Sequence, residues 1–377
     1  MGTLGVGIIG CGNISVAYLR LGPLFNGLEI RAVADLNMDA AKARAAEFNV
    51  RAETVADLLA ADDIDVVVNL TIPDAHFEVT KSILEAGKHA YSEKPLVLTL
   101  DQGETLRALA TAKGLRIGSA PDTFLGGAHQ QARAEIDAGS IGEVVAGSAH
   151  VMSRGMEHWH PNPDFFFLPG AGPVLDIGPY YVTNLVQLLG PVKRVASLAT
   201  SASRTRTILS EPRRGETIPV KTPTNIHALL EFDQGATITF SASWDVKAHR
   251  HPNMELYGTK GSLFIPDPNF FGGDLQRADE AGKVSTLAPW DHPFGIPNEP
   301  HGDRMQANYR TAGLADMVQG IAENRPHRCS LELAIHAVDV MTSILKSGEI
   351  GAFVEIGTTC ARPAPLTPDQ AQNLLKA

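Results

Sequence analysis

Cysteine is scarce in this 377-residue sequence, which contains only Cys11, Cys329 and Cys360. An odd number of widely spaced cysteines without a C-x-x-C pair predicts neither a disulfide framework nor a zinc site, so we interpret them as free thiols. Long apolar runs are also lacking, because stretches such as Ile64–Leu70 have the length of a strand and fall far below the ~20 residues that span a bilayer. Residues Met1–Gly10 lack the positive start and the small-residue cleavage site of a signal peptide. We expect a cytoplasmic protein that does not cross a membrane.

The sequence has no block of like charges and no basic stripe. Its formal net charge of −10 favours solubility and argues against nucleic acid or an anionic membrane surface as a partner. A chain of 377 residues, 44% of them hydrophobic, is too long for one typical core and can bury two. We therefore expect two domains.

Short apolar runs alternate with segments of helical periodicity in the first 120 residues. The strand candidates are Leu4–Ile9, Ile30–Ala34, Asp65–Leu70, His89–Tyr91 and Leu115–Ile117. The helix candidates are Ile14–Leu21, Met38–Phe48, Ala75–Ala86 and Leu100–Ala112, the last three with N-caps at Asn37, Asp74 and Thr99. Such βα alternation predicts an α/β domain over residues 1–122, built on a doubly wound parallel sheet with helices on both faces.

The pattern changes after about Pro121 and predicts a second, α+β domain over residues 123–377. It has a helix candidate at Pro179–Leu189, and Ser203–Pro223 is the best candidate for a mobile loop. Alternating runs predict a mostly antiparallel open sheet with a tight hairpin at Gly258–Gly261; these runs are Ile226–Phe232, Ala236–Trp244, Asn253–Tyr257 and Ser262–Ile265. An apolar face left exposed on such a sheet would favour pairing of subunits, so we expect a homodimer or homotetramer.

The segment Gly10–Ser15 directly follows the first predicted strand and opens the first predicted helix. In that context the pattern Gly10-Cys11-Gly12-Asn13-Ile14 predicts a dinucleotide-binding loop of a Rossmann domain, whose glycines let the backbone approach a pyrophosphate at a helix N-terminus. Ser15 replaces the third glycine of the full pattern and is small enough for close packing of helix on strand. Cys11 could be a nucleophile, but a small buried side chain is the favoured interpretation.

Asp35 ends the second predicted strand, where an acidic side chain accepts hydrogen bonds from the ribose hydroxyls of the cofactor. Its charge would repel a 2′-phosphate, which favours NAD over NADP. Arg31 and Lys42 are near enough in sequence to leave NADP open. The competing interpretation is a pair of turn glycines with an Asp that caps a helix.

Three further segments resemble the Gfo/Idh/MocA oxidoreductases. Ser92-Glu93-Lys94-Pro95 matches the Glu-Lys-Pro hallmark of that family, and Thr71-Ile72-Pro73-Asp74-Ala75-His76 resembles its T-P-x-x-H turn with Ile72 inserted. The segment Gly170–Tyr180 resembles its G-G-G-x-x-x-D-x-G-x-H segment. The resemblance spans nearly the whole chain and implies that Thr71, Ile72, Pro73, His76, Glu93 and Lys94 lie at the cofactor.

The same resemblance implies an NAD(P)-dependent dehydrogenase with Lys94, Asp176 and Tyr180 as catalytic and substrate-binding residues. Tyr180 stands where most members have His and Thr183 where many have a second Asp. The Asp-x-Gly-x-Tyr form resembles members that act on cyclic sugars or diols. A nearby ammonium favours the phenolate, so either Tyr180 with help from Lys94 or Lys94 itself can be the base that takes the hydroxyl proton.

Further side chains suit a polyol pocket. A Trp159 face can pack on a sugar ring while His160 hydrogen-bonds its hydroxyls, and Arg310 can grip hydroxyls or a carboxylate. The alternative for Arg310 is a surface ion pair. The His158-Trp159-His160 pattern lacks a third ligand at diagnostic spacing, so we expect no metal.

Two other functions compete with a sugar or polyol dehydrogenase. Some proteins of this fold are NAD-dependent glycosidases, which oxidise a sugar, eliminate and reduce it again. Others bind dinucleotide and sugar as sensors without catalysis, although the intact Glu93-Lys94-Pro95 and Asp176 argue against that interpretation.

Overall fold

The structure, a computed structural model, describes residues 2–376. Its chain forms two compact units. Unit 1 comprises Met1–Gly127, Asp291–Val338 and Pro363–Ala377, and unit 2 comprises Ala128–Trp290 and Asp339–Arg362. This division reflects compactness, and the domain limits 1–122 and 123–377 stay a prediction.

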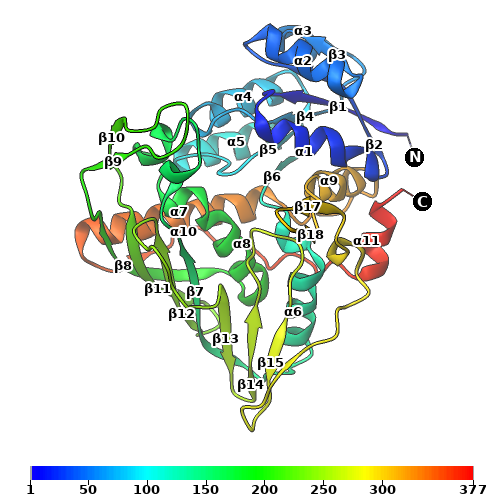
Figure 1. Ribbon diagram of the computed structural model, residues 1–377. Coiled ribbons are helices and arrows are strands. Elements are labelled where there is room, and N and C mark those ends of the chain that lie inside the picture. The colour runs from blue at the N-terminus through cyan, green and yellow to red at the C-terminus, as the bar shows by residue number, and fades with distance from the viewer. Residues whose placement is uncertain (1, 377) are drawn as a thin grey trace. The chain divides into compact units, whose positions relative to one another are not determined.

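The sheet of unit 1 has six parallel strands in the order β3-β2-β1-β4-β5-β6 (Figure 1). The strands are β1 Leu4–Ile9, β2 Leu28–Ala34, β3 Arg51–Glu53, β4 Val66–Asn69, β5 His89–Ser92 and β6 Ile117–Ser119. All four residues of β4 are buried, as expected of a strand covered on both faces. The predicted doubly wound α/β sheet is confirmed, although the predicted β6 begins two residues too early and β3 was not predicted.

The helices of unit 1 lie between these strands and in the two later segments of the unit, 291–338 and 363–377. They are α1 Asn13–Leu21, α2 Met38–Phe48, α3 Val55–Ala60, α4 Pro73–Glu85, α5 Leu100–Lys113, α9 Ala312–Ala322 and α11 Pro368–Leu374, and a hairpin consists of β17 Glu299–His301 and β18 Arg304–Gln306. The predicted N-caps Asn37 and Thr99 are confirmed, because their side chains accept from the N–H groups of Asp39 and Gln102. The predicted cap Asp74 is wrong. Helix α4 begins at Pro73 after Ile72, since a proline at the first helical position has no N–H that needs a cap.

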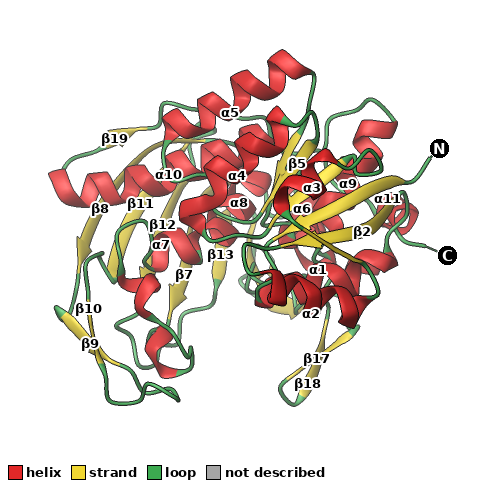
Figure 2. Cartoon of the chain, turned by 90° about the horizontal axis from the view of Figure 1, so that it is seen from above, coloured by secondary structure: helices red, strands yellow, loops and turns green. Residues whose placement is uncertain are grey.

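Unit 2 is built on a nine-stranded sheet in the order β16-β15-β14-β13-β7-β12-β11-β8-β19, whose central strands lie side by side in Figure 2. The strands are β7 Val144–Met152, β8 Val192–Thr200, β11 Asn225–Phe232, β12 Thr237–Ser243, β13 Met254–Gly258, β14 Gly261–Ile265, β15 Gln276–Ala278, β16 Val284–Thr286 and β19 Val354–Glu355. Among the strands of this sheet within residues 2–376, only β12 and β7 pair in parallel. The prediction of a mostly antiparallel sheet with a hairpin at Gly258–Gly261 is confirmed.

One face of this sheet is buried and the other is partly exposed. Helices of the unit are α6 Gly127–Asp137, α7 Pro173–Asp176, α8 Gly178–Leu189 and α10 Leu331–Ile350, and the limit between the units falls inside α10. The buried face carries Leu230, Ile238 and Phe240, all fully enclosed. On the opposite face Leu198 and Leu229 are 72% and 47% exposed.

The segment 203–223 contains a two-stranded hairpin, β9 Thr205–Thr207 with β10 Thr217–Pro219. Ile208, which follows β9, and Ile218, within β10, are buried in a cluster with Phe167 and Trp244. The predicted mobile loop is therefore a packed hairpin in the structure.

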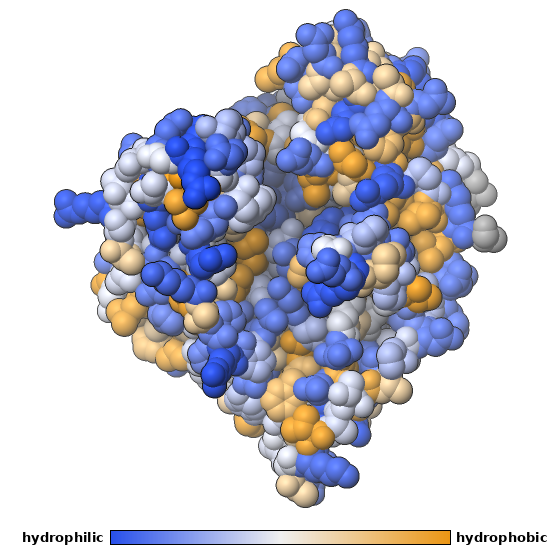
Figure 3. All heavy atoms as spheres, in the orientation of Figure 1, coloured by the Kyte–Doolittle hydropathy of each residue, from blue (hydrophilic) through white to orange (hydrophobic). Residues whose placement is uncertain are grey.

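Within residues 2–376 we find no helix that combines the length and the apolar character needed to cross a membrane. On the face drawn in Figure 3, hydrophobic residues form small patches separated by hydrophilic ones. Singly scattered apolar residues of this kind are normal on protein surfaces.

Candidate active site

The predicted cofactor residues of unit 1 follow the carboxyl ends of four adjacent strands. The register pairs Ile9 with Ala34 and Asn69, and Asn69 with Ser92, so the residues after these positions meet at one edge of the sheet. Between β1 and β4 the strand order reverses. Open α/β sheets bind ligands at such a switch point, outside the carboxyl ends of the strands.

The turn after β1 depends on Gly10. Its φ of +104° is a conformation that side chains rarely adopt, and a Cβ there would lie 2.6 Å from the carbonyl oxygen of Leu70. Gly12, the residue before α1, is exposed, and a Cβ added to it meets nothing within 4 Å. Open space at the N-terminus of α1 is what an approaching pyrophosphate requires.

Ser15 is fully buried in the first turn of α1, and its hydroxyl donates to the carbonyl oxygen of Gly12 at 2.6 Å. A serine therefore fits where the full dinucleotide pattern has its third glycine. Asn13 and Ile14, the other predicted residues of the loop, begin α1, with Asn13 exposed and Ile14 half-buried.

The half-buried Asp35 carboxylate holds the two loops at this edge together. Its Oδ2 accepts from the N–H of Cys11 and its Oδ1 from the N–H of Asn37, both at 2.8 Å. A carboxylate has about four acceptor positions, so two stay available for ribose hydroxyls. The next residue, Leu36, is 99% exposed, an apolar surface suited to covering an adenine ring. Leu36 was not predicted from the sequence, because residue type alone does not distinguish an exposed leucine from a buried one.

Cys11 is 6% exposed, and its Sγ lies 3.6 Å from the carbonyl oxygen of Ala34. Burial, with the Asp35 charge as a smaller cause, raises the pKa of the Cys11 thiol to about 11. A thiol in this state is a poor nucleophile. The favoured interpretation of Cys11 as a small buried side chain therefore agrees with its environment.

His76 links the turn after β4 to the turn after β5. Its Nδ1 lies 2.7 Å from the carbonyl oxygen of Pro95 and its Nε2 3.0 Å from that of Thr71. Burial lowers the pKa of His76, which favours the neutral ring, and a neutral ring has one N–H and so donates to only one of these two carbonyl oxygens. Ile72, in the turn after β4, is 68% exposed beside Pro73 and offers a second apolar surface at the edge.

The loop that carries Lys94 is positioned through Glu93. The hydroxyl of buried Tyr18, in α1, donates to Glu93 Oε1 at 3.1 Å, and the N–H of Lys94 donates to Glu93 Oε2 at 3.1 Å. Lys94 itself is half-buried. Tyr18 was missed from the sequence because nothing in its spacing connects α1 with a loop 75 residues later.

Arg310 stands just before α9 in unit 1. Its guanidinium donates to Asn308 Oδ1 at 3.2 Å. Buried Asp122 orients the turn that follows, because its Oδ2 accepts from the N–H groups of Thr311 and Gly313 at 3.0 and 3.1 Å. Burial raises the pKa of Asp122 to about 6. Asp122 was also missed from the sequence.

In unit 2, Asp176 ends α7 and Tyr180 lies in the first turn of α8. Ile177 between the helices keeps helical backbone angles, so two side chains four residues apart project from the same side. Asp176 and Tyr180 are both half-buried, whereas the neighbouring Tyr181 is fully buried.

Trp159 and His160 follow a short 3-10 turn, Met156–His158, rather than a strand. Trp159 is 64% exposed, and its ring lies edge-on to that of His160, with the two ring centroids 5.3 Å apart. His160 Nδ1 accepts from the N–H of Asn162 at 3.1 Å. No group of three potential metal ligands occurs among residues 2–376.

Comparison with known proteins gives two family matches. Residues 4–120 match an oxidoreductase family with an NAD-binding Rossmann fold, and residues 129–264 match the GFO/IDH/MocA C-terminal domain. Among curated relatives, a dTDP-3,4-didehydro-2,6-dideoxy-alpha-D-glucose 3-reductase of Streptomyces violaceoruber is 30% identical over 70% of this chain and 72% of its own length. A 1,5-anhydro-D-fructose reductase of Ensifer adhaerens is 23% identical over 93% of this chain and 98% of its own.

Other relatives match over a shorter part. The chain spans 65% and 40% of the length of two uncharacterised Schizosaccharomyces pombe oxidoreductases, which are 30% and 34% identical to it over those parts. Among solved structures, a levoglucosan dehydrogenase in complex with NADH and L-sorbose has a TM-score of 0.80 at 21% identity, covering 95% of this chain and all of that one. At this identity the likeness shows the fold alone.

Proposed function

Because the chain belongs to the Gfo/Idh/MocA family of oxidoreductases, we propose that it transfers a hydride between an alcohol carbon of a sugar or polyol and the nicotinamide of NAD. The observation that carries this proposal is the edge of the unit 1 sheet where Gly12, Asp35 and Lys94 follow the carboxyl ends of β1, β2 and β5. The two sugar reductases among its relatives support the substrate class.

NAD, when bound, would supply the acceptor for the hydride of the carbinol carbon. The chain must then supply a base for the hydroxyl proton, so that an alcohol becomes a ketone and the proton leaves with the base. We propose that Tyr180 takes this proton, that Lys94 stabilises the phenolate and hydrogen-bonds the substrate oxygen, and that Asp176 orients the substrate. Trp159, His160 and Arg310 are proposed to bind the remaining hydroxyls.

Lys94 is the alternative base. The two assignments predict different kinetic constants for Tyr180→Phe, which removes the phenol hydroxyl. With Tyr180 as base, Tyr180→Phe should lower kcat by roughly 10²–10⁴-fold at unchanged NAD affinity. With Lys94 as base, Tyr180→Phe should chiefly raise KM, whereas Lys94→Ala should abolish turnover.

The test is NADH formation, followed by absorbance, with a panel of aldoses, inositols and sugar glycosides and with wild type, Lys94→Ala and Tyr180→Phe. Formation of NADH that both variants lose would support the proposal. Cleavage of a glycoside without net NADH would refute the dehydrogenase and support an NAD-dependent glycosidase. Saturable NAD binding without either reaction would refute it in favour of a non-catalytic sensor.

The choice of NAD rests on Asp35, whose carboxylate already accepts two N–H groups and would face a 2′-phosphate. Arg31 is held by Glu29 at 2.8 Å and by the carbonyl oxygen of Asp63, so its charge is engaged on the protein itself. Lys42 leaves use of NADP open.

We further propose that a second copy covers the partly exposed face of the unit 2 sheet. Leu198 and Leu229 lie on that face and are more exposed than is usual for strand leucines. Light scattering after gel filtration should give a dimer or tetramer that Leu198→Glu and Leu229→Glu together convert to a monomer. A location in the cytoplasm stays a prediction.

A further inference from the structure

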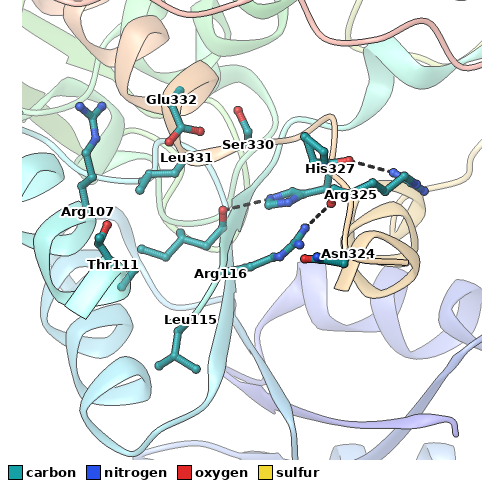
Figure 4. Close-up of a pocket in the computed structure, with 13 residues that line it drawn as sticks. Arg107, Thr111, Leu115, Arg116, Asn324, Arg325, His327, Ser330, Leu331 and Glu332 are labelled. Atoms are coloured by element: carbon teal, nitrogen blue, oxygen red, sulfur yellow. Dashed lines mark hydrogen bonds between the residues drawn. The ribbon is translucent and has the colours of Figure 1, made fainter. Parts of the chain in front are cut away.

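A pocket of about 370 Å³ lies in unit 1 away from the predicted cofactor residues (Figure 4). It is lined by α5, by the amino end of β6 and by the segment 324–332 that follows α9. In a parallel sheet the amino ends of all strands lie at one edge, and the cofactor residues follow the carboxyl ends at the other. The pocket is therefore separate from the site proposed for NAD.

Arg116, at the amino end of β6, is the main charge of this pocket. One of its terminal nitrogens donates to the carbonyl oxygen of Arg325, and it makes no ion pair with a carboxylate among residues 2–376. A half-buried guanidinium held in place by a backbone oxygen keeps its full positive charge and further N–H donors.

Arg107, on α5, lines the opposite side of the pocket in Figure 4. Its Nε is buried and has no hydrogen-bond acceptor, and its ion pair with Glu104 is long, at 3.4 Å. Buried N–H groups are nearly always paired. The terminal nitrogens of Arg107, whose one ion pair among residues 2–376 is this long contact, keep N–H donors for a ligand oxygen.

The other ionisable groups of the pocket add little positive charge. Arg325 pairs with Asp316 at 3.1 Å and with Glu323 at 2.7 Å. Burial lowers the pKa of His327, and the neutral ring donates from Nε2 to the carbonyl oxygen of Ile117 at 3.1 Å. Glu332 is the only carboxylate of the lining; it is exposed, and it can accept from a ligand hydroxyl.

The remaining lining is largely apolar. Its apolar residues are Ala110, Leu115, Ile117, Pro326 and Leu331, and its polar residues are Thr111, Asn324 and Ser330. Small-molecule sites of this size combine an apolar wall with a few polar groups that fix orientation. The wall suits a carbon skeleton, and the two arginines suit an oxyanion attached to it.

We propose that this pocket is a second binding site, for a small organic oxyanion such as a phosphate ester or a carboxylate. Arg116 and Arg107 bind the oxyanion, and the apolar wall contacts its carbon skeleton. This site goes beyond the proposed hydride transfer, because it shares no residue with the predicted cofactor or substrate residues.

The test is a calorimetric titration of the full chain with inorganic phosphate, phenyl phosphate and benzoate. Saturating NAD in cell and syringe keeps the anions from the Gly10–Gly12 loop, and neither organic probe has an alcohol to oxidise. We expect a dissociation constant below roughly 1 mM for at least one organic probe. Tighter phenyl phosphate would identify a phosphate ester, tighter benzoate a carboxylate.

Variants locate the site. Arg116→Gln and Arg107→Gln should each weaken binding at least tenfold, whereas Arg51→Gln, at an exposed arginine paired with Asp63, should not. Thr111→Trp fills the pocket from exposed helix surface and should also abolish binding, so the proposal stays testable if Arg116→Gln fails to fold. NAD affinity serves as the folding control. No binding by either organic probe, or binding that these variants leave unchanged, would overturn the proposal.

Discussion

Acid should destabilise unit 2 through His129, a fully buried residue of α6. Its Nε2 donates to the carbonyl oxygen of Phe270 at 2.8 Å, and its Nδ1 accepts from Asn184 Nδ2 at 3.2 Å. Gln187 fixes the direction of the second bond, since its Nε2 donates to Asn184 Oδ1 at 3.0 Å. A proton on Nδ1 would therefore meet an amide donor instead of an acceptor.

The magnitude follows from the pKa. Burial lowers the pKa of His129 to about 4, whereas an unfolded histidine titrates near 6.5. Because the folded pKa is the lower one, the unfolded chain gains the proton first as pH falls. The contribution of neutral His129 is complete above about pH 6.5 and is lost between about pH 6.5 and pH 4, and lowering the pH from about 7 to about 5 should cost about 2 kcal/mol.

Tryptophan fluorescence during urea unfolding reports on unit 2, because all three tryptophans, Trp159, Trp244 and Trp290, belong to that unit. Burial also lowers the pKa of His150, in the same unit, to about 4, so wild type alone cannot assign the loss. The stability difference between wild type and His129→Gln should therefore shrink by about 2 kcal/mol between about pH 7 and about pH 5.

Gln130→Asn is the matched control, since it shortens the next buried side chain of α6 without removing an ionisable group. Its stability difference from wild type should be the same at both pH values. If the His129→Gln difference were equally constant, the assignment of a neutral, acid-sensitive His129 would be refuted.

Three further predictions concern unit 1. Gly10→Ala should lower the free energy of unfolding by roughly 1–3 kcal/mol and abolish NAD binding, because its Cβ strikes the backbone. Gly12→Ala should weaken NAD binding but leave the stability nearly unchanged. Calorimetry of unfolding and of NAD binding for both variants checks this contrast. Asp35→Ser should raise the NAD dissociation constant at least tenfold and move the NADP to NAD preference toward NADP; an unchanged preference would contradict the role given to its charge. Asp316→Leu should destabilise the chain by about 3–5 kcal/mol, because it leaves the buried Arg328 guanidinium unpaired, and Asp316→Leu with Arg328→Met should recover much of that loss in urea unfolding.

The sequence predicted the elements whose signals are local. The four strands β1, β2, β4 and β5 and the long helices between them follow from periodicity, and the caps Asn37 and Thr99 follow from residue type. Asp74 shows the limit of that reasoning, because the proline before it starts the helix without a cap.

What the sequence could not predict depends on contacts between distant residues. The bond from Tyr18 to Glu93 and the bonds from Asp122 to the turn before α9 need the fold before they can be seen. The hairpin in 203–223 was missed for the same reason, since its burial against Phe167 and Trp244 outweighs a polar, proline-containing sequence that is typical of a loop.

Unit 1 is built from three separate segments of the chain, which limits how early it can fold during synthesis. Phe25, just after α1, forms a β-bridge with Leu375, and Asn26 donates to the carbonyl oxygens of Asn373 and Leu375. Buried Arg328 likewise donates to the carbonyl oxygens of Ala364 and Pro365. The ribosome has therefore passed residue 363 and the segment after it before the dinucleotide-binding unit can close. We infer that a nascent chain stalled after residue 362 holds this unit incomplete, with its surface for the last segment exposed to chaperones.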